Sequence, residues 1–223
     1  MNIALDMMGG DYAPLETIKG VKLFLSENQN EEVELTLIGD ENKLLPLLDE
    51  YKVSSEKITV VHASEVIEMQ EHPTKALKEK QQSSISIGFH FLATGKTDAF
   101  ISAGNTGAML VGSLYSIKAI SGVSRPAIGA YIPGDNGKTS LIVDVGLNAD
   151  CKPENLSQFA LLGSLFSKYI SGLSSHSNIQ RLQLANNCIA FFNSQPQKSR
   201  SFGNIALIVS LVLPIPRYHS VGW

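Results

Sequence analysis

Three short loops combine glycine with carboxylate, amide or hydroxyl side chains, which are the groups that bind small anions. Glycine allows the backbone to approach a ligand closely, and backbone N–H groups then act as donors. The loops span residues 6–11, 102–107 and 144–148. The candidate residues are Asp6, Gly9, Gly10 and Asp11 in the first loop, Ser102, Gly104, Asn105, Thr106 and Gly107 in the second, and Asp144, Gly146 and Asn148 in the third.

The loop at residues 102–107 has the strongest anion-binding pattern. A short apolar run, Ala99-Phe-Ile101, precedes it, and a helical pattern begins at Thr106. A strand, a small-residue loop and a helix N-terminus direct backbone N–H groups and the positive end of the helix dipole at an anion. The loop has neither the Gly-Lys-Ser/Thr of nucleotide hydrolases nor a Gly-x-Gly-x-x-Gly pattern. A plain strand-to-helix turn, capped by Asn105 or Thr106, is the alternative interpretation.

The elements that must position these loops are apolar strands alternating with helices. The predicted strands cover residues 3–6, 33–38, 58–62, 99–101, 127–132 and 139–143. This alternation predicts an α/β fold with three layers around a mostly parallel, Rossmann-like sheet. The last two strands flank the turn at residues 133–137, which predicts a hairpin or an antiparallel strand.

All three loops follow the C-terminal ends of predicted strands. In open α/β sheets, ligands bind at that edge, so the pattern predicts a single cleft lined by backbone N–H groups, Asp6, Asn105, Asp144 and Asn148. For each aspartate taken alone, a cap or a hydrogen bond within its loop is the more common role.

Composition excludes several classes of protein. The chain has 223 residues, a hydrophobic fraction of 43% and a net charge of −3, which argues against a nucleic-acid binder. The N-terminus has no basic segment followed by a long apolar core, so no signal peptide is expected. The two cysteines, Cys151 and Cys188, do not form a disulfide framework and are expected to be free thiols in a cytoplasmic protein. No histidine lies at metal-ligand spacing, and no metal or other cofactor is predicted.

The acidic residues are confined to the first 154 positions of the chain. None of the 21 acidic residues follows Glu154, while the C-terminal part retains five basic residues and is rich in Ser, Asn and Gln. A basic surface segment is one interpretation. The favoured one is a chain that leaves its proper reading frame near residue 170. We therefore expect residues 1–170 to form an α/β domain that is incomplete at its C-terminus, and residues 171–223 to be an unrelated, poorly ordered tail.

An ordered set of motifs resembles one known family. Leu5-Asp-Met-Met-Gly-Gly-Asp-Tyr-Ala-Pro14, Ser102-Ala-Gly-Asn-Thr-Gly-Ala108 and Asp144-Val-Gly-Leu-Asn-Ala-Asp-Cys151 are similar to segments of the phosphate acyltransferases of bacterial phospholipid synthesis, the PlsX family. Arg125-Pro126 and Gly137-Lys-Thr139 also fit. The resemblance is collinear from Met1 to about Lys168.

The resemblance implies an enzyme that moves a fatty acyl group from acyl carrier protein to inorganic phosphate. It also implies a phosphotransacetylase-like fold, a homodimer and loose attachment to the inner face of the membrane. Within the loops, we expect phosphate to bind backbone donors and Asn105. Asn148 or backbone N–H groups would steady the oxyanion, and Asp6 would complete the catalytic set.

Two other functions remain open. One is a short-chain phosphotransacetylase that uses acyl-coenzyme A, and the other is an inactive phosphate-binding fragment. The sequence also departs from the family pattern. Leu147 replaces the usual alanine, and the acidic motifs that the family carries further along are absent.

Overall fold

The computed structural model describes residues 1–28, 32–133, 139–144, 148, 151–169, 179–184 and 187–193. These residues form two compact units, one comprising Met1–Lys118 and the other beginning at Ala119. Each unit has its own sheet, with two buried clusters in the first unit and one in the second.

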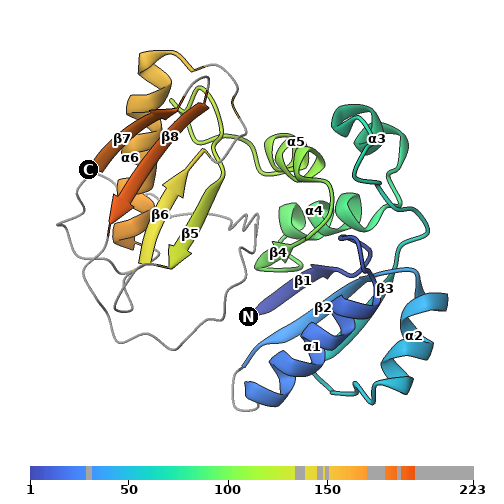
Figure 1. The fold of residues 1–223 in the computed structure, drawn as a ribbon. Helices are drawn as coiled ribbons and strands as arrows, with labels where there is room; N and C mark the ends of the chain where they lie inside the picture. Colours follow the sequence, from blue (N-terminus) through green and yellow to red (C-terminus); the bar gives the residue numbers. More distant parts are fainter. Residues whose placement is uncertain are drawn as a thin grey trace, which may run out of the picture. The chain divides into compact units, whose positions relative to one another are not determined.

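The first unit is a parallel α/β layer structure (Figure 1). In chain order, its elements are β1 (Asn2–Asp6), α1 (Leu15–Glu27), β2 (Glu34–Gly39), α2 (Glu41–Glu50), β3 (Ile58–His62), α3 (Pro73–Glu79), α4 (Ser84–Thr94), β4 (Ala99–Ile101) and α5 (Thr106–Ser116). The strands lie in the order β3-β2-β1-β4, and every pair is parallel. The predicted three-layer, mostly parallel fold is therefore confirmed for this unit.

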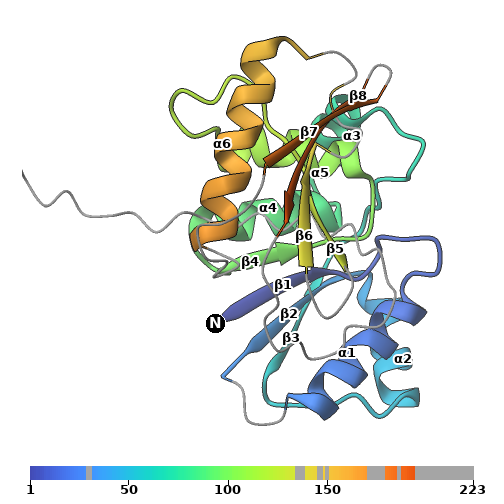
Figure 2. The same cartoon turned by 60° about the vertical axis from the view of Figure 1, so that its left-hand side comes forward.

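Apolar residues cover both faces of this sheet. Leu35 and Leu37 of β2 pack with residues of α1 and α2, while Ile38 packs on the opposite face with residues of α4 and α5. Figure 2 shows α1 and α2 together on one side of the four strands. Since successive strand residues point to opposite faces, burial on both sides explains why the adjacent residues Leu37 and Ile38 are both apolar.

Helix boundaries in this unit follow local chemistry that the sequence indicates. Ser83 begins α4, since its Oγ accepts the N–H of Ser86 at 3.3 Å, and Asp40 begins α2 by accepting the N–H of Asn42 at 3.1 Å. Gly95 ends α4 in the left-handed region, with φ 73°. Such caps satisfy backbone groups that a helix end leaves without partners.

The second unit contains an antiparallel sheet packed against one helix. Its elements are β5 (Gly129–Pro133), β6 (Thr139–Val143), α6 (Pro153–Tyr169), β7 (Ile179–Leu184) and β8 (Asn187–Asn193), with strand order β5-β6-β8-β7. The predicted antiparallel pairing of β5 with β6 is confirmed. Phe159 of α6 is fully buried with Leu141 and Val143 of β6.

Strands β7 and β8 lie in the segment that the sequence analysis assigns to an unrelated tail. They pair with each other, and β8 also pairs with β6. The other residues after 170 lie outside the described part of the chain, so the origin of the tail and its lack of order stay predictions.

Candidate functional site

Asp6 ends β1 and joins the first two predicted loops. Its Oδ2 accepts a hydrogen bond from Ser102 Oγ at 2.7 Å, and its Oδ1 accepts the N–H of Met8 at 3.0 Å. The link forms because β1 and β4 are neighbours in the sheet, with Leu5 in register with Ile101. The predicted meeting of the loops at residues 6–11 and 102–107 is thus present in the structure.

Ser102 extends this link into the second loop. Its Oγ donates to Asp6 and also accepts the N–H of Gly104 at 2.9 Å. Both Asp6 and Ser102 are about 95% buried, with exposed fractions of 4% and 5%. A carboxylate, a hydroxyl and a backbone amide therefore form one continuous buried chain.

Glycine is required where the two loops touch. A Cβ at Gly9 would lie 2.5 Å from Asp6 Oδ2 and 2.6 Å from the nitrogen of Gly104. A Cβ at Gly104 would have its nearest contacts at 3.2 Å. Gly10 adopts a φ of 103°, a conformation that residues with a side chain rarely take.

Burial raises the pKa of Asp6, and hydrogen bonds from Ser84, Ser102 and the backbone of Met8 and Gly9 partly oppose that rise. Both carboxylate oxygens are occupied by donors of the protein. In this arrangement Asp6 serves as a hydrogen-bond acceptor that holds the loops together, which is the role that aspartates at such positions usually have. Its predicted place among the catalytic residues stays a prediction.

Asn105 is the N-cap of α5. Its Oδ1 accepts the N–H of Ala108 at 2.9 Å, so the capped-turn interpretation is correct for this residue. Its Nδ2 lies 3.0, 3.2 and 3.1 Å from the carbonyl oxygens of Glu68, Met69 and Glu71. Both ends of the amide are therefore engaged, and the side chain acts on the loop by fixing it.

The donors left in the second loop are backbone N–H groups and the hydroxyl of Thr106. Among the described residues, no hydrogen bond uses the N–H of Thr106 or of Gly107, the first two residues of α5. Such N–H groups at a helix N-terminus favour anions. Gly107 also lets α5 approach α3, because a Cβ there would collide with the ring of Pro73.

The third predicted loop belongs to the second unit. Asp144 follows β6, is fully buried and has a φ of 67°. Asn148 Nδ2 donates to Asp144 Oδ1 at 2.8 Å and to the carbonyl oxygen of Pro126 at 3.1 Å. Burial raises the pKa of Asp144, against the hydrogen bonds from Asn148 and the charge of Arg125.

The structure thus brings together two of the three predicted loops, while the convergence of the third stays a prediction. Gly146 lies outside the described residues, and Asp11 is exposed, so its predicted role in substrate binding stays a prediction. Sequence reasoning missed the bond from Ser84 to Asp6. It also missed the backbone carbonyls that Asn105 binds, which have no signature in the sequence.

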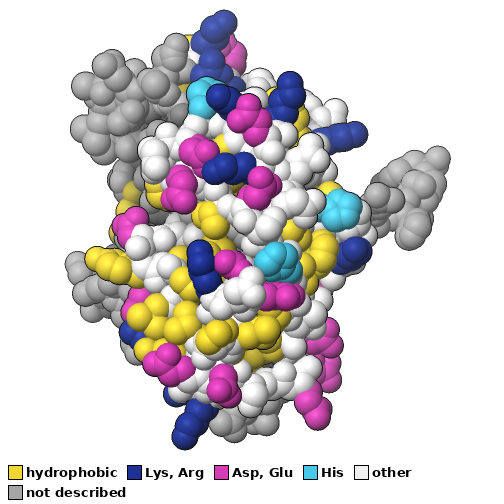
Figure 3. Space-filling model, turned by 90° about the vertical axis from the view of Figure 1, so that its right-hand side faces the viewer, with side chains coloured by type: hydrophobic (Ala, Val, Ile, Leu, Met, Phe, Trp, Pro, Cys, Tyr) yellow, Lys and Arg dark blue, Asp and Glu magenta, His cyan; other side chains and the backbone are white. Residues whose placement is uncertain are grey.

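Other features of the described residues offer less chemistry. No three His, Cys, Asp or Glu side chains among them are grouped to hold a metal ion. A groove of about 500 Å³ lies in the first unit, lined by Leu45, Leu48, Asp49, Lys52, Val53, Ser54, Ser55, Ile58 and Val60. Figure 3 shows a face on which hydrophobic side chains gather in the lower half, with acidic and basic side chains interspersed. None of the described helices has the length and apolar character needed to cross a membrane.

Comparison with known proteins gives a consistent result. Residues 1–186 match the sequence profile of a family described as "Fatty acid synthesis protein". Two curated relatives, both named phosphate acyltransferase, come from Dictyoglomus turgidum and Thermoanaerobacterium thermosaccharolyticum. The first is 45% identical over 170 residues, covering 76% of this chain and 50% of the relative. The second is 46% identical over 168 residues, covering 75% and 48%. The chain spans about half the length of these relatives.

Solved structures with a similar fold include two phosphotransacetylases. The enzyme from Streptococcus pyogenes aligns with a TM-score of 0.56 at 16% identity, covering 75% of this chain and 54% of that one. The EutD phosphotransacetylase from Staphylococcus aureus aligns with a TM-score of 0.50 at 20% identity, covering 75% and 53%. At these identities the likeness concerns the fold.

Proposed function

The chain belongs to the fatty acid synthesis protein family, and from that membership we propose that it forms part of an enzyme that transfers a fatty acyl group to inorganic phosphate. The proposed donor is an acyl thioester of acyl carrier protein, and the product is acyl phosphate for phospholipid synthesis. The names of the curated relatives support the reaction class.

The observation that carries this proposal is the buried junction between the loops at residues 6–11 and 102–107. Asp6, Ser102 and Gly104 fix the second loop, and Asn105 fixes the start of α5. This leaves the N–H groups of Thr106 and Gly107 at a helix N-terminus, where they favour an anion without a charged side chain. We assign phosphate to this position.

In the proposed reaction, a phosphate oxygen attacks the carbonyl carbon of the thioester. The new C–O bond forms, the C–S bond breaks, and the thiolate leaves and takes up a proton. Donors fixed before the reaction stabilise the negative charge on the carbonyl oxygen more effectively than water does. We propose that Asn105 and Asp6 act as positioning residues for these donors. The part that Asn148 and Asp144 would take stays a prediction.

A direct test measures phosphate binding and acyl transfer in parallel. Phosphate is titrated into the purified 223-residue chain, with wild type compared to Asn105→Ala, whose phosphate affinity we expect to be about tenfold lower. Acyl phosphate formation is then assayed with acyl carrier protein and coenzyme A thioesters, on this chain and on the full-length Dictyoglomus turgidum relative.

The outcomes separate the candidate functions. Faster turnover with a short acyl-coenzyme A would favour a phosphotransacetylase, which the likeness in fold makes the second candidate. Phosphate binding without transfer by this chain would indicate a phosphate-binding fragment. Absence of phosphate binding in the wild-type chain would refute the assignment of the site.

The family resemblance also supports proposals about assembly and location. We propose that the intact enzyme is a homodimer in the cytoplasm and attaches loosely to the inner face of the membrane. Sedimentation of the full-length relative and its flotation with anionic vesicles test these two proposals separately.

A further inference from the structure

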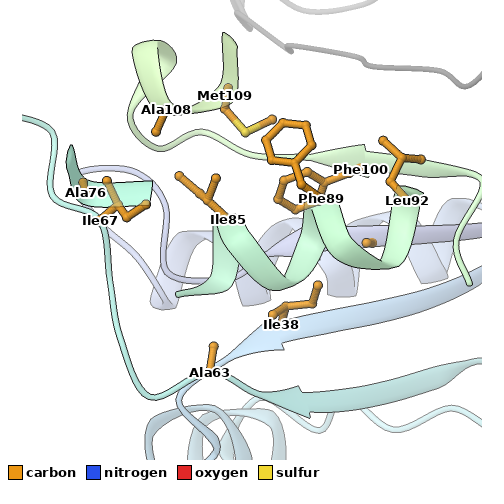
Figure 4. Packing of buried hydrophobic residues seen from close by; sticks show 11 residues of the cluster. Ile38, Ala63, Ile67, Ala76, Ile85, Phe89, Leu92, Phe100, Ala108 and Met109 are labelled. Atoms are coloured by element: carbon orange, nitrogen blue, oxygen red, sulfur yellow. The ribbon is translucent and has the colours of Figure 1, made fainter. Parts of the chain in front are cut away.

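Residues 65–72, named the strap here, connect the segment after β3 to the start of α3 and lie against the N-cap of α5. The carbonyl oxygens of Glu68, Met69 and Glu71 accept hydrogen bonds from Asn105 Nδ2. The strap is also anchored from inside, because Ile67 is buried in the same cluster as Ala108 of α5 (Figure 4). The strap and the start of α5 therefore share both polar and apolar contacts.

Lys80 forms hydrogen bonds with the strap at two points. Lys80 Nζ lies 2.7 Å from the carbonyl oxygen of Val66 and 2.6 Å from Glu71 Oε2. The same Glu71 oxygen accepts the N–H of Glu68 at 2.8 Å. Bonding to Lys80 and to the Glu68 N–H lowers the pKa of Glu71, so the carboxylate is charged at neutral pH.

A second ion pair near α3 provides an internal comparison. Lys75 and Glu79 are 4.0 Å apart, with side chains 72% and 63% exposed, whereas the side chains of Lys80 and Glu71 are 29% and 30% exposed. Exposed pairs of the first kind contribute little, since water screens them. The Lys80–Glu71 pair differs because both groups also bind backbone atoms of the strap.

We propose that Lys80 and Glu71 are positioning residues for the loop at residues 102–107, acting through the strap and Asn105. The Asn105 amide can cap α5 in its present orientation only while the strap carbonyls hold its Nδ2. Loosening Lys80 or Glu71 releases those carbonyls, and the cap on Ala108 weakens with them. The consequence for phosphate rests on the proposed function, whereas the mechanical link between strap and helix does not.

The test uses the full 223-residue chain and compares wild type with Lys80→Met, Glu71→Gln, Lys80→Arg and the control Lys75→Met. Amide hydrogen exchange is followed at Ala108, whose N–H binds Asn105, and at Leu37 in β2 as a reference for global stability. Phosphate affinity is measured by titration of inorganic phosphate on the same samples.

Lys80→Met and Glu71→Gln should each speed exchange at Ala108 about tenfold and weaken phosphate binding several-fold, because each removes a charge-assisted hydrogen bond. Exchange at Leu37 measures the change in global stability of each variant, and exchange at Ala108 is compared against it. Lys80→Arg should recover part of both effects, and Lys75→Met should match wild type.

Unchanged exchange at Ala108 in both Lys80→Met and Glu71→Gln would overturn the inference. Faster exchange with unaltered phosphate affinity would also overturn it, by showing that the strap does not position the binding loop. If wild type binds no phosphate while exchange at Ala108 responds as expected, the proposed function fails and the link between Lys80 and α5 stands.

Discussion

Two buried aspartates lie where strands end, Asp6 as the last residue of β1 and Asp144 directly after β6, and their hydrogen-bond partners lie at different distances along the chain. Asp6 accepts from Ser102, which lies 96 positions further along the chain, directly after the neighbouring strand β4. Asp144 accepts from Asn148, only four positions away. The first carboxylate therefore joins two loops, whereas the second shapes a single loop.

Backbone geometry sharpens this contrast. Asp144 adopts a positive φ, 67°, which an aspartate tolerates at some cost because its side chain can bond locally. At the first site glycine takes the unusual conformation, with φ 103° at Gly10, and Asp6 lies within a regular strand. The contact between the two loops around Asp6 thus depends on glycine for its close approach. The loop after β6 depends on Asp144 itself.

The largest expected effect comes from removing the long-range carboxylate. Asp6→Ala leaves the donors of Ser102 and Met8 buried without an acceptor, so we expect the free energy of unfolding to fall by about 3 kcal/mol. Asp144→Gly should cost about 1–2 kcal/mol, since it removes a local acceptor while glycine takes the positive φ without strain. Urea denaturation followed by circular dichroism measures both. Equal losses would contradict the distinction between the two aspartates.

A smaller effect is expected at the contact between the loops. Gly9→Ala places a methyl group against Asp6 Oδ2 and the Gly104 nitrogen, which should cost about 1–3 kcal/mol of stability. Gly20→Ala in α1 is the matched control, because a Cβ there meets nothing within 4 Å and alanine favours a helix by about 0.5–1 kcal/mol. Thermal melts of both variants should shift in opposite directions. A Gly9→Ala chain as stable as wild type would show that the loops separate easily.

The smallest effect concerns pH. The pKa of Asp6 is raised above its ordinary value of 3.8 because the carboxyl is buried, so folding favours the protonated form relative to the unfolded chain. The stabilisation that this proton gives is fully present below pH 3.8 and is lost as pH rises through the raised pKa. The asparagine of Asp6→Asn cannot ionise. As pH rises through that interval, the free energy of unfolding of this variant should therefore increase relative to that of wild type. Urea titrations at several pH values measure the difference, and a difference independent of pH would contradict the assigned shift.

Local features of the site could be predicted from the sequence. The ends of β1 and β4, the Asn105 cap and the hairpin of β5 and β6 follow from apolar runs, a small-residue loop and turn residues. Each of these depends on residues close together in the chain, where periodicity and capping chemistry act.

Partners set by tertiary structure could not be predicted in the same way. The bond from Ser102 to Asp6 requires β4 to lie beside β1, which follows from strand order and not from either loop. The carbonyls bound by Asn105 come from an irregular segment whose side chains do not reveal the contact. Strands β7 and β8 lie where the loss of acidic residues had suggested an unrelated tail.

The hydrogen bonds between Asn105 and the strap have a consequence for sequence variation. Its amide binds main-chain carbonyls, which every amino acid supplies, so these hydrogen bonds do not depend on the side chains of residues 68 and 69. Natural variants of this chain can therefore drift at these two positions without losing the connection. The asparagine has no such freedom, because aspartate lacks the donor and glutamine is one methylene too long to cap the same helix. We therefore expect residues 68 and 69 to vary among related sequences, whereas Asn105 should stay the same.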